Sequence, residues 1–134
     1  MKTVCLVAFA FSTLFFCAAQ KSVTYVAHYL EPFPGPQAYK DLSSGTILYV
    51  ESDGRHVAAI SPEGKILWNR DPFSDAHLEF YRTDKPQIIF IGPAKADDYP
   101  KGWKRKEIAA IAFNNSQFGD LRIGDGEFQI LGRD

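Results

Sequence analysis

Residues 45–69 read Gly45-Thr-Ile-Leu-Tyr-Val-Glu-Ser-Asp-Gly-Arg-His-Val-Ala-Ala-Ile-Ser-Pro-Glu-Gly-Lys-Ile-Leu-Trp-Asn69, and they carry the clearest fold signal in the chain. Asp53-Gly54 between two apolar runs is typical of a hairpin turn, which needs positive φ at both central residues. The second turn, Ser61–Gly64, places Pro62 and a glycine at positions that a tight turn favours. The stretch therefore predicts a three-stranded antiparallel meander, with strands at 46–51, 56–60 and 65–68.

The rest of the chain shows the same succession of short apolar runs and turns. Gln87–Ile91 is apolar after its first residue, which predicts a central strand, and Asp75–Arg82 alternates, which predicts a half-buried strand. Lys104–Phe113 fits a helix, although its second half fits a buried strand equally well. Gly124–Gly126 joins the last two runs as a tight hairpin. Further strands are expected at 23–29, 107–113, 119–123 and 127–131.

This spacing of turn signals is typical of all-β folds. We predict a single all-β domain over residues 20–134, in which antiparallel meanders form a small sheet, a sandwich or a partial propeller-like domain. The Pro-rich segment 31–36 interrupts it as an extended arm, because proline lacks the backbone donor that a ladder needs. The glycines expected to shape turns are Gly54, Gly64 and Gly126. The aromatic residues expected in the core are Tyr49, Trp68, Phe80, Phe90, Phe113 and Phe128.

The first nineteen residues have the layout of a secretory signal peptide. Lys2 supplies a positive charge, an apolar run extends from Val4 to Phe16, and small residues precede an expected cleavage after Ala19. The run is shorter than the roughly 20 residues that span a bilayer, which disfavours a membrane anchor. Bulky residues before Cys17 disfavour a lipid anchor. The mature chain is therefore expected to be secreted or periplasmic and not to span a membrane.

Composition narrows the possible functions. The chain has 134 residues, with 15 Lys and Arg, 16 Asp and Glu, and a formal net charge of −1. This balance argues against a nucleic-acid partner, which normally selects a basic surface. Both cysteines, Cys5 and Cys17, lie in the predicted signal. A disulfide, a thiol nucleophile and a thiolate metal site are therefore not expected in the mature chain.

Residues 45–69 resemble one blade repeat of the PQQ-like β-propellers. That repeat consists of a strand, an Asp-Gly turn, a second strand, a Pro/Asp-x-Gly-Lys turn and a strand that closes on Trp. The matching residues are Tyr49-Val50, Asp53-Gly54, Ala59-Ile60, Pro62-Glu63-Gly64-Lys65 and Trp68. A weaker similarity to secreted propeller-like proteins covers 113–131. The resemblance implies that Trp68 packs between neighbouring blades.

The resemblance does not imply the quinone cofactor, because the repeat is a structural unit in most proteins that carry it, and no cofactor is predicted. A propeller has about 4 to 8 blades, which exceeds what residues 20–134 can hold. The resemblance therefore implies either a stand-alone β-domain built from blade-like meanders or an assembly of several copies.

Three groups of polar residues are candidates for chemistry. Asp75, His77 and Glu79 would project from one face of a strand and could bind a metal or act as acid and base, although a solvated strand face explains them as well. Asp97-Asp98 lacks the ligand spacing of a calcium loop. The serines lack a Gly-x-Ser-x-Gly elbow, and Gly124–Gly126 is not followed by a helix as a phosphate loop would be.

A basic cluster with two aromatic residues is the candidate binding site. It could dock an anionic partner with Trp103 as an anchor, while nearby carboxylates favour a charge-balanced loop as the competing interpretation. Its candidate residues are Tyr99, Trp103, Lys104, Arg105 and Lys106. The sequence thus predicts an exported, non-catalytic binding or cell-envelope protein whose partner is a protein, a glycan or an envelope component. The alternatives are a structural homo-oligomer that assembles blade-like sheets and a small hydrolase.

Overall fold

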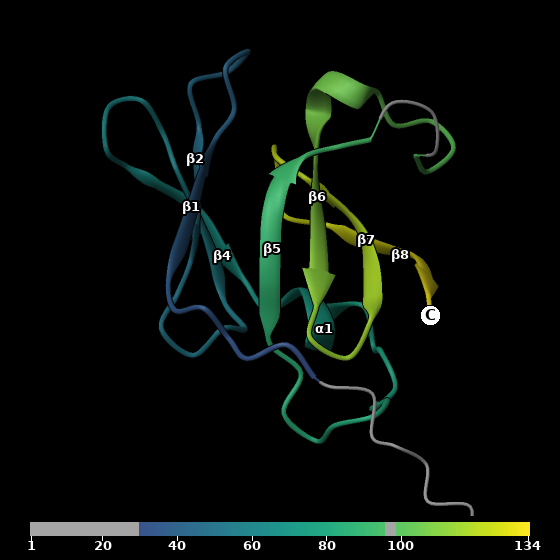
Figure 1. Cartoon of the computed structure of the whole chain (residues 1–134). Helices are drawn as coiled ribbons and strands as arrows, with labels where there is room; N and C mark the ends of the chain where they lie inside the picture. The colour runs from purple at the N-terminus through teal and green to yellow at the C-terminus, as the bar shows by residue number, and fades with distance from the viewer. Residues whose placement is uncertain (1–29, 96–98) are drawn as a thin grey trace, which may run out of the picture.

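The computed structural model describes residues 30–95 and 99–134. It contains two four-stranded antiparallel sheets, each a meander in chain order (Figure 1). The prediction of an all-β fold made of antiparallel meanders is therefore confirmed. The first sheet comprises β1 (Gln37–Lys40), β2 (Ile47–Val50), β3 (Val57–Ile60) and β4 (Ile66–Arg70). The second sheet comprises β5 (Ile88–Pro93), β6 (Ile108–Phe113), β7 (Gln117–Arg122) and β8 (Phe128–Arg133).

The first sheet contains the meander predicted over 45–69 and one strand more. The Asp53 carboxylate accepts hydrogen bonds from the backbone N–H groups of Arg55 and His56, at 2.9 and 3.0 Å, and so closes the first turn. The additional strand, β1, pairs with β2 along its whole length. It directly follows the Pro-rich segment 31–36, which forms no regular element.

The second sheet differs from expectation at its first strand. Strand β5 lies at the edge of the sheet, so the prediction of a central strand at 87–91 is wrong. A bulge between Ile88 and Phe90 turns Ile88 and Ile91 toward the core and leaves Phe90 on the outer face. The ambiguity over Lys104–Phe113 resolves into a 3₁₀ turn at Arg105–Glu107 followed by strand β6.

The strand predicted at Asp75–Arg82 is not formed, so that prediction is wrong. Asp75 ends a short helix, residues 76–77 form a turn, and Tyr81 makes a single bridge with Thr83. The short helix α1 spans Pro72–Asp75. Asp71 precedes it, and its carboxylate accepts a hydrogen bond from the Ser74 backbone N–H at 3.1 Å. This cap and a proline at the first helical position favour a helical turn over a strand. The strand expected at 23–29 lies outside the described residues.

The main core lies between the inner faces of the two sheets. Leu48, Val50 and Val57 come from the first sheet, and Ile111, Phe113 and Leu121 from the second. The Phe113 ring makes edge contacts with Phe73 of α1 and Phe128 of β8, at centroid distances of 5.6 and 5.9 Å. No helix among residues 30–95 and 99–134 is long and apolar enough to cross a bilayer.

The predicted aromatic core is correct only in part. Phe113 and Phe128 are buried, and Trp68 packs partly buried against the core. Phe80, Phe90 and Tyr49 are 66%, 48% and 37% exposed, so their assignment to the core is wrong. Phe90 and Tyr49 lie on outer sheet faces, and Phe80 follows the helical segment. Alternation along a strand separates two faces without saying which one is buried.

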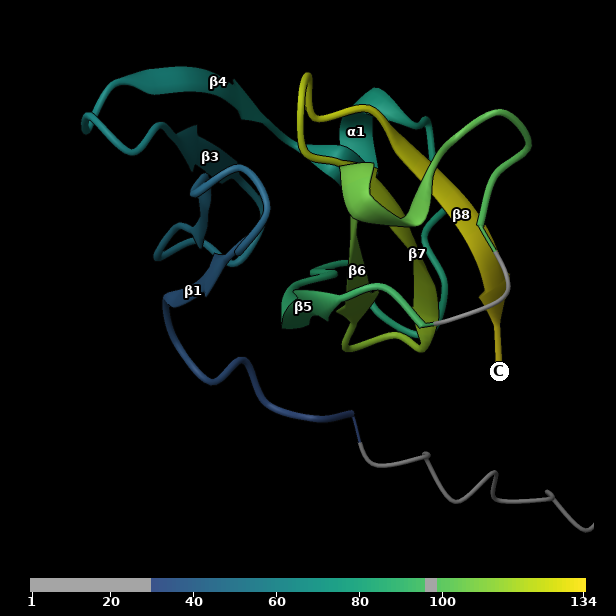
Figure 2. The ribbon, with the colours of Figure 1, turned by 90° about the horizontal axis from the view of Figure 1, so that it is seen from above.

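The two sheets are arranged like an open fan. Strands β1 and β5 lie side by side, whereas β4 and β8 lie far apart, with α1 between them (Figure 2). Gln37 donates from Nε2 to the Ile88 carbonyl at 3.3 Å, and the Ile88 backbone N–H donates to the Gly54 carbonyl at 2.7 Å. These bonds join the start of β5 to the first sheet and hold the fan at its narrow side.

Trp68 connects the sheets at the wide side of the fan. Its indole Nε1–H donates to the carbonyl of Ile123 at 2.8 Å. The turn at Gly126 packs directly on the Trp68 ring, because a Cβ built on Gly126 would lie 2.7 Å from that ring. Gly126 also has a φ of +76°, which L-residues rarely adopt.

Replacing Gly126 by alanine should therefore destabilise the fold more than replacing Gly64, which serves as the matched control. Gly64 has a φ of +83° but has no atom within 4 Å of the position of an added Cβ. We expect Gly64→Ala to cost about 1–2 kcal/mol for the left-handed backbone. Gly126→Ala should cost about 1–3 kcal/mol more, for overpacking against Trp68. Urea unfolding measures both, and equal losses would contradict the contact with Trp68.

Candidate functional site

The predicted binding cluster is divided between surface and interior. Tyr99, Lys104, Arg105 and Lys106 are exposed, while Trp103 is only 8% exposed and packs with Ala94 and Ile108 in a small second core. Trp103 is buried because it packs against Ile108, a buried residue of β6, and against the small apolar residue Ala94. The binding role of these five residues remains a prediction. Trp103, the expected aromatic anchor, is buried and not on the surface.

The cation nearest to Trp103 is itself held by carboxylates. The Arg122 guanidinium lies 4.9 Å from the centroid of the Trp103 ring. It bonds Asp125 through two nitrogens, at 2.9 and 2.6 Å, and also pairs with Glu127. The hydrogen bond from Arg122 is the main cause that lowers the pKa of Asp125. The charge of Arg122 beside Trp103 is therefore paired with carboxylates of the turn that follows β7.

The acidic trio predicted at Asp75, His77 and Glu79 does not share one strand face. Asp75 ends α1 and pairs with Arg70 at 3.6 Å, and His77 has a left-handed φ of 51°. The geometry predicted for the trio is therefore wrong, because Asp75 ends a helix, His77 lies in a turn and Glu79 lies in a segment without regular structure. No group of three or more His, Cys, Asp or Glu side chains in the described part of the chain is placed to hold a metal ion. Asp97-Asp98 lies outside the described residues.

The imidazole of His56 forms a close pair with a carboxylate on the first-sheet turn. His56 Nδ1 lies 2.5 Å from Asp53 Oδ2, and each side chain is about half exposed. The hydrogen bond with Asp53 is the main cause that raises the pKa of His56. Burial alone would raise the pKa of Asp53, but the hydrogen bonds from Arg55 and His56 outweigh it and lower that pKa to about 2. Within the described residues, no serine hydroxyl is hydrogen-bonded to the His56 ring, whose partner is Asp53.

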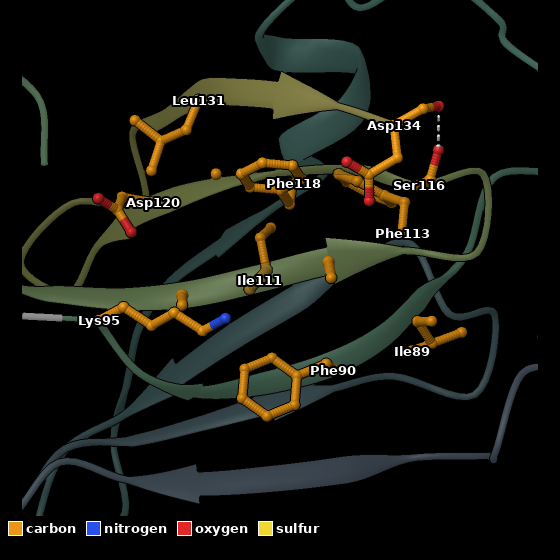
Figure 3. Close-up of a pocket in the computed structure, with 13 residues that line it drawn as sticks. Ile89, Phe90, Lys95, Ile111, Phe113, Ser116, Phe118, Asp120, Leu131 and Asp134 are labelled. Carbon is orange, nitrogen blue, oxygen red and sulfur yellow. Dashed lines mark hydrogen bonds between the residues drawn. The ribbon is translucent and has the colours of Figure 1, made fainter. Parts of the chain in front are cut away.

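A hollow lies on the outer face of the second sheet, which turns away from the first sheet (Figure 3). This outer groove has a volume of about 640 Å³. Phe90 of β5, Phe118 of β7 and Leu131 of β8 form its walls, and Ala110 and Ala112 of β6 form its floor. The three wall residues are 48%, 38% and 38% exposed, which is high for large apolar side chains.

Strand register explains why this face is hollow. Phe90 lies opposite Ala112, Ala112 opposite Phe118, and Phe118 opposite Gly132. Large and small residues therefore alternate across the sheet. Each ring also lies over a glycine, since a Cβ on Gly92 would be 2.7 Å from the Phe90 ring and one on Gly132 would be 3.0 Å from the Phe118 ring. The Phe90 and Phe118 rings therefore lie over these glycines at the sides of the outer groove, and no ring covers Ala112 between them.

Polar groups are confined to the two ends of the outer groove. Asp120 is buried at one end, on the side where Lys95 also lies (Figure 3). At the other end, the Ser116 hydroxyl donates to the carbonyl of Asp134 at 2.9 Å. The outer groove is thus an apolar strip with polar ends, suited to an apolar surface of a partner. Sequence reasoning missed it because Phe90 was assigned to the core.

No family model, no curated protein and no solved structure matches this chain. The assignment of a site therefore rests on the geometry and chemistry described above.

The His56–Asp53 pair predicts a measurable pH dependence. Asp53→Asn should lower the pKa of His56 toward 6.5, as followed by NMR of the ring protons, whereas Asp125→Asn should leave it unchanged. Asp53 contributes stability above pH 3.8 that is lost as the pH falls toward 2. His56 contributes stability that is complete below 6.5 and is lost as the pH rises through its raised pKa. A His56 pKa that does not respond to Asp53→Asn would rule the pair out.

Proposed function

We propose that this chain is an exported, non-catalytic binding module, and that its partner is a protein seated in the outer groove. The observation that carries the proposal is the exposed row of Phe90, Phe118 and Leu131 around an alanine floor. Contiguous apolar surface of this kind marks interaction sites in many proteins. The signal-like layout of residues 1–19 supports export.

The chemistry of the outer groove favours a protein over a glycan. A sugar presents many hydroxyl groups, and a site for it needs polar partners along the whole contact. Here Ala112 and two phenylalanine rings form the middle of the outer groove, while Asp120 lies opposite Ala110 at one end and Ser116 lies at the other. Well-packed aromatic anchors with a polar rim are typical of protein interfaces.

The polar groups at the outer groove support a binding role rather than a catalytic one. The Ser116 hydroxyl is used as a donor to the Asp134 carbonyl. The described lining of the outer groove holds no histidine that could act as a base for it. The His56–Asp53 pair lies on a turn of the first sheet, away from the second sheet's outer face.

Photocrosslinking in cells that export the chain tests this proposal. A photoreactive phenylalanine analogue at Phe90 should yield covalent adducts with a protein, because that ring lines the outer groove. The same analogue at Leu42, which is 90% exposed on a loop of the first sheet, is the control and should yield few. Adding Phe118→Asp should remove the adducts formed from position 90.

Equal crosslinking from the two positions, or no protein adduct from Phe90, would contradict the proposal. Mass spectrometry of the adduct identifies the partner, and adducts with a lipid or a glycan in place of a protein would also count against it.

A further inference from the structure

We propose that the partner in the outer groove is a second copy of this chain. The outer face of the first sheet in one copy packs on the outer groove of the next copy, and the contact repeats head to tail until the ring closes. The inference rests on the proposed function, since it names the occupant of the same site.

The two sheets are related by a rotation about the narrow side of the fan. Both sheets begin there, and their strands follow outward in chain order (Figures 1 and 2). Strands β1 and β5 run side by side in the same direction. Gln37 near the start of β1 bonds Ile88 at the start of β5, and Tyr39 near the end of β1 lines one hollow with Pro93 at the end of β5. Turning the first sheet about this axis therefore brings it onto the second.

The rotation decides which faces are equivalent. The inner face of the first sheet looks toward the second sheet, so the same rotation carries it onto the face of the second sheet that looks onward. That onward face is the one that bears the outer groove. Its equivalent in the first sheet is already covered by a sheet. Within the chain, the inner face of the second sheet packs on the first sheet. The face equivalent to it should therefore pack on the outer groove, and that face is the outer face of the first sheet in another copy.

The outer face of the first sheet has the chemistry that this contact needs. Across the strands, Tyr49 lies between Ala38 and Ala58, and Ile60 lies between Ile47 and Ile66. Tyr49 is 37% exposed and Ile66 is 69% exposed. This face carries an apolar row beside an alanine-flanked aromatic ring, as the outer groove does, and the two rows end in the exposed polar residues Lys40 and Asn69. Joining the two faces would bury apolar surface on both, which is the main driving force for association.

A head-to-tail contact that repeats by rotation about one axis, with no shift along that axis, closes into a ring. Each copy contributes two sheets to the ring. Rings of radiating four-stranded sheets contain about 4 to 8 sheets, so the assembly should contain about two to four copies. Both outer faces are covered in such a ring. Phe118 and Ile66, which are exposed in the single copy, would then be buried.

Light scattering on the purified exported chain tests the inference through its mass in solution. The wild type should have about two to four times the mass of one chain. A charge in either face should reduce the mass to that of one chain, because a carboxylate or guanidinium cannot be buried there unpaired. The variants are Phe118→Asp and Ala112→Arg in the outer groove, and Tyr49→Asp in the first-sheet face. Leu42→Asp removes an exposed apolar residue outside both faces and should keep the wild-type mass.

Each variant is checked for cooperative thermal unfolding, and Ala112→Arg keeps the test valid if loss of Phe118 prevents folding. A wild type with the mass of one chain at every concentration would overturn the inference. An oligomer that survives Tyr49→Asp would overturn the head-to-tail contact. A single-chain mass together with Phe90 adducts to a different protein would overturn the second copy as partner and leave the proposed function standing.

Discussion

Burial of one apolar face of each meander against the other holds this fold together. Each sheet has four short strands, and such a sheet is not stable in water without something packed on one face. Phe113 stands at the centre of that contact, with Phe73 on one side and Phe128 on the other. The short helix α1 has its place in the fold because Phe73 completes this aromatic row. Without the contact between sheets, neither Trp68 nor the β5 edge has a fixed position.

The fan shape follows from where the sheets are tied. Gln37 donates to the Ile88 carbonyl and the Ile88 N–H donates to the Gly54 carbonyl, which joins the start of β5 to the first sheet, while Trp68 and α1 fill the wide side. Sheets joined at one side in this way bury one face each and leave one face each open. These open faces are the one with the outer groove and the outer face of the first sheet, and both carry exposed apolar side chains. The proposed interaction surface is thus a direct consequence of how the core is built, and it needs no separate binding loop.

Local signals predicted what local chemistry decides. The meander over 45–69 and the final hairpin follow from turn residues, and the structure confirms them. Faces could not be predicted, because an alternating strand gives two faces and only the tertiary contact selects one. Phe90 was therefore assigned to the core although it lies outside. Asp75–Arg82 alternates as a strand would, but the helical turn capped by Asp71 ends at Asp75, and the residues after it belong to neither sheet. For Trp103, the sequence showed charged neighbours and not the small core that buries it.

The central claim is that two different faces of the chain fit each other. A mixing experiment tests it most directly, with one variant charged in the first-sheet face, Tyr49→Asp, and one charged in the outer groove, Phe118→Asp. Each variant alone should have the mass of one chain. An equimolar mixture should contain a complex of two chains and nothing larger, because one sound copy of each face remains. A mixture that keeps the mass of one chain at high concentration would contradict the account.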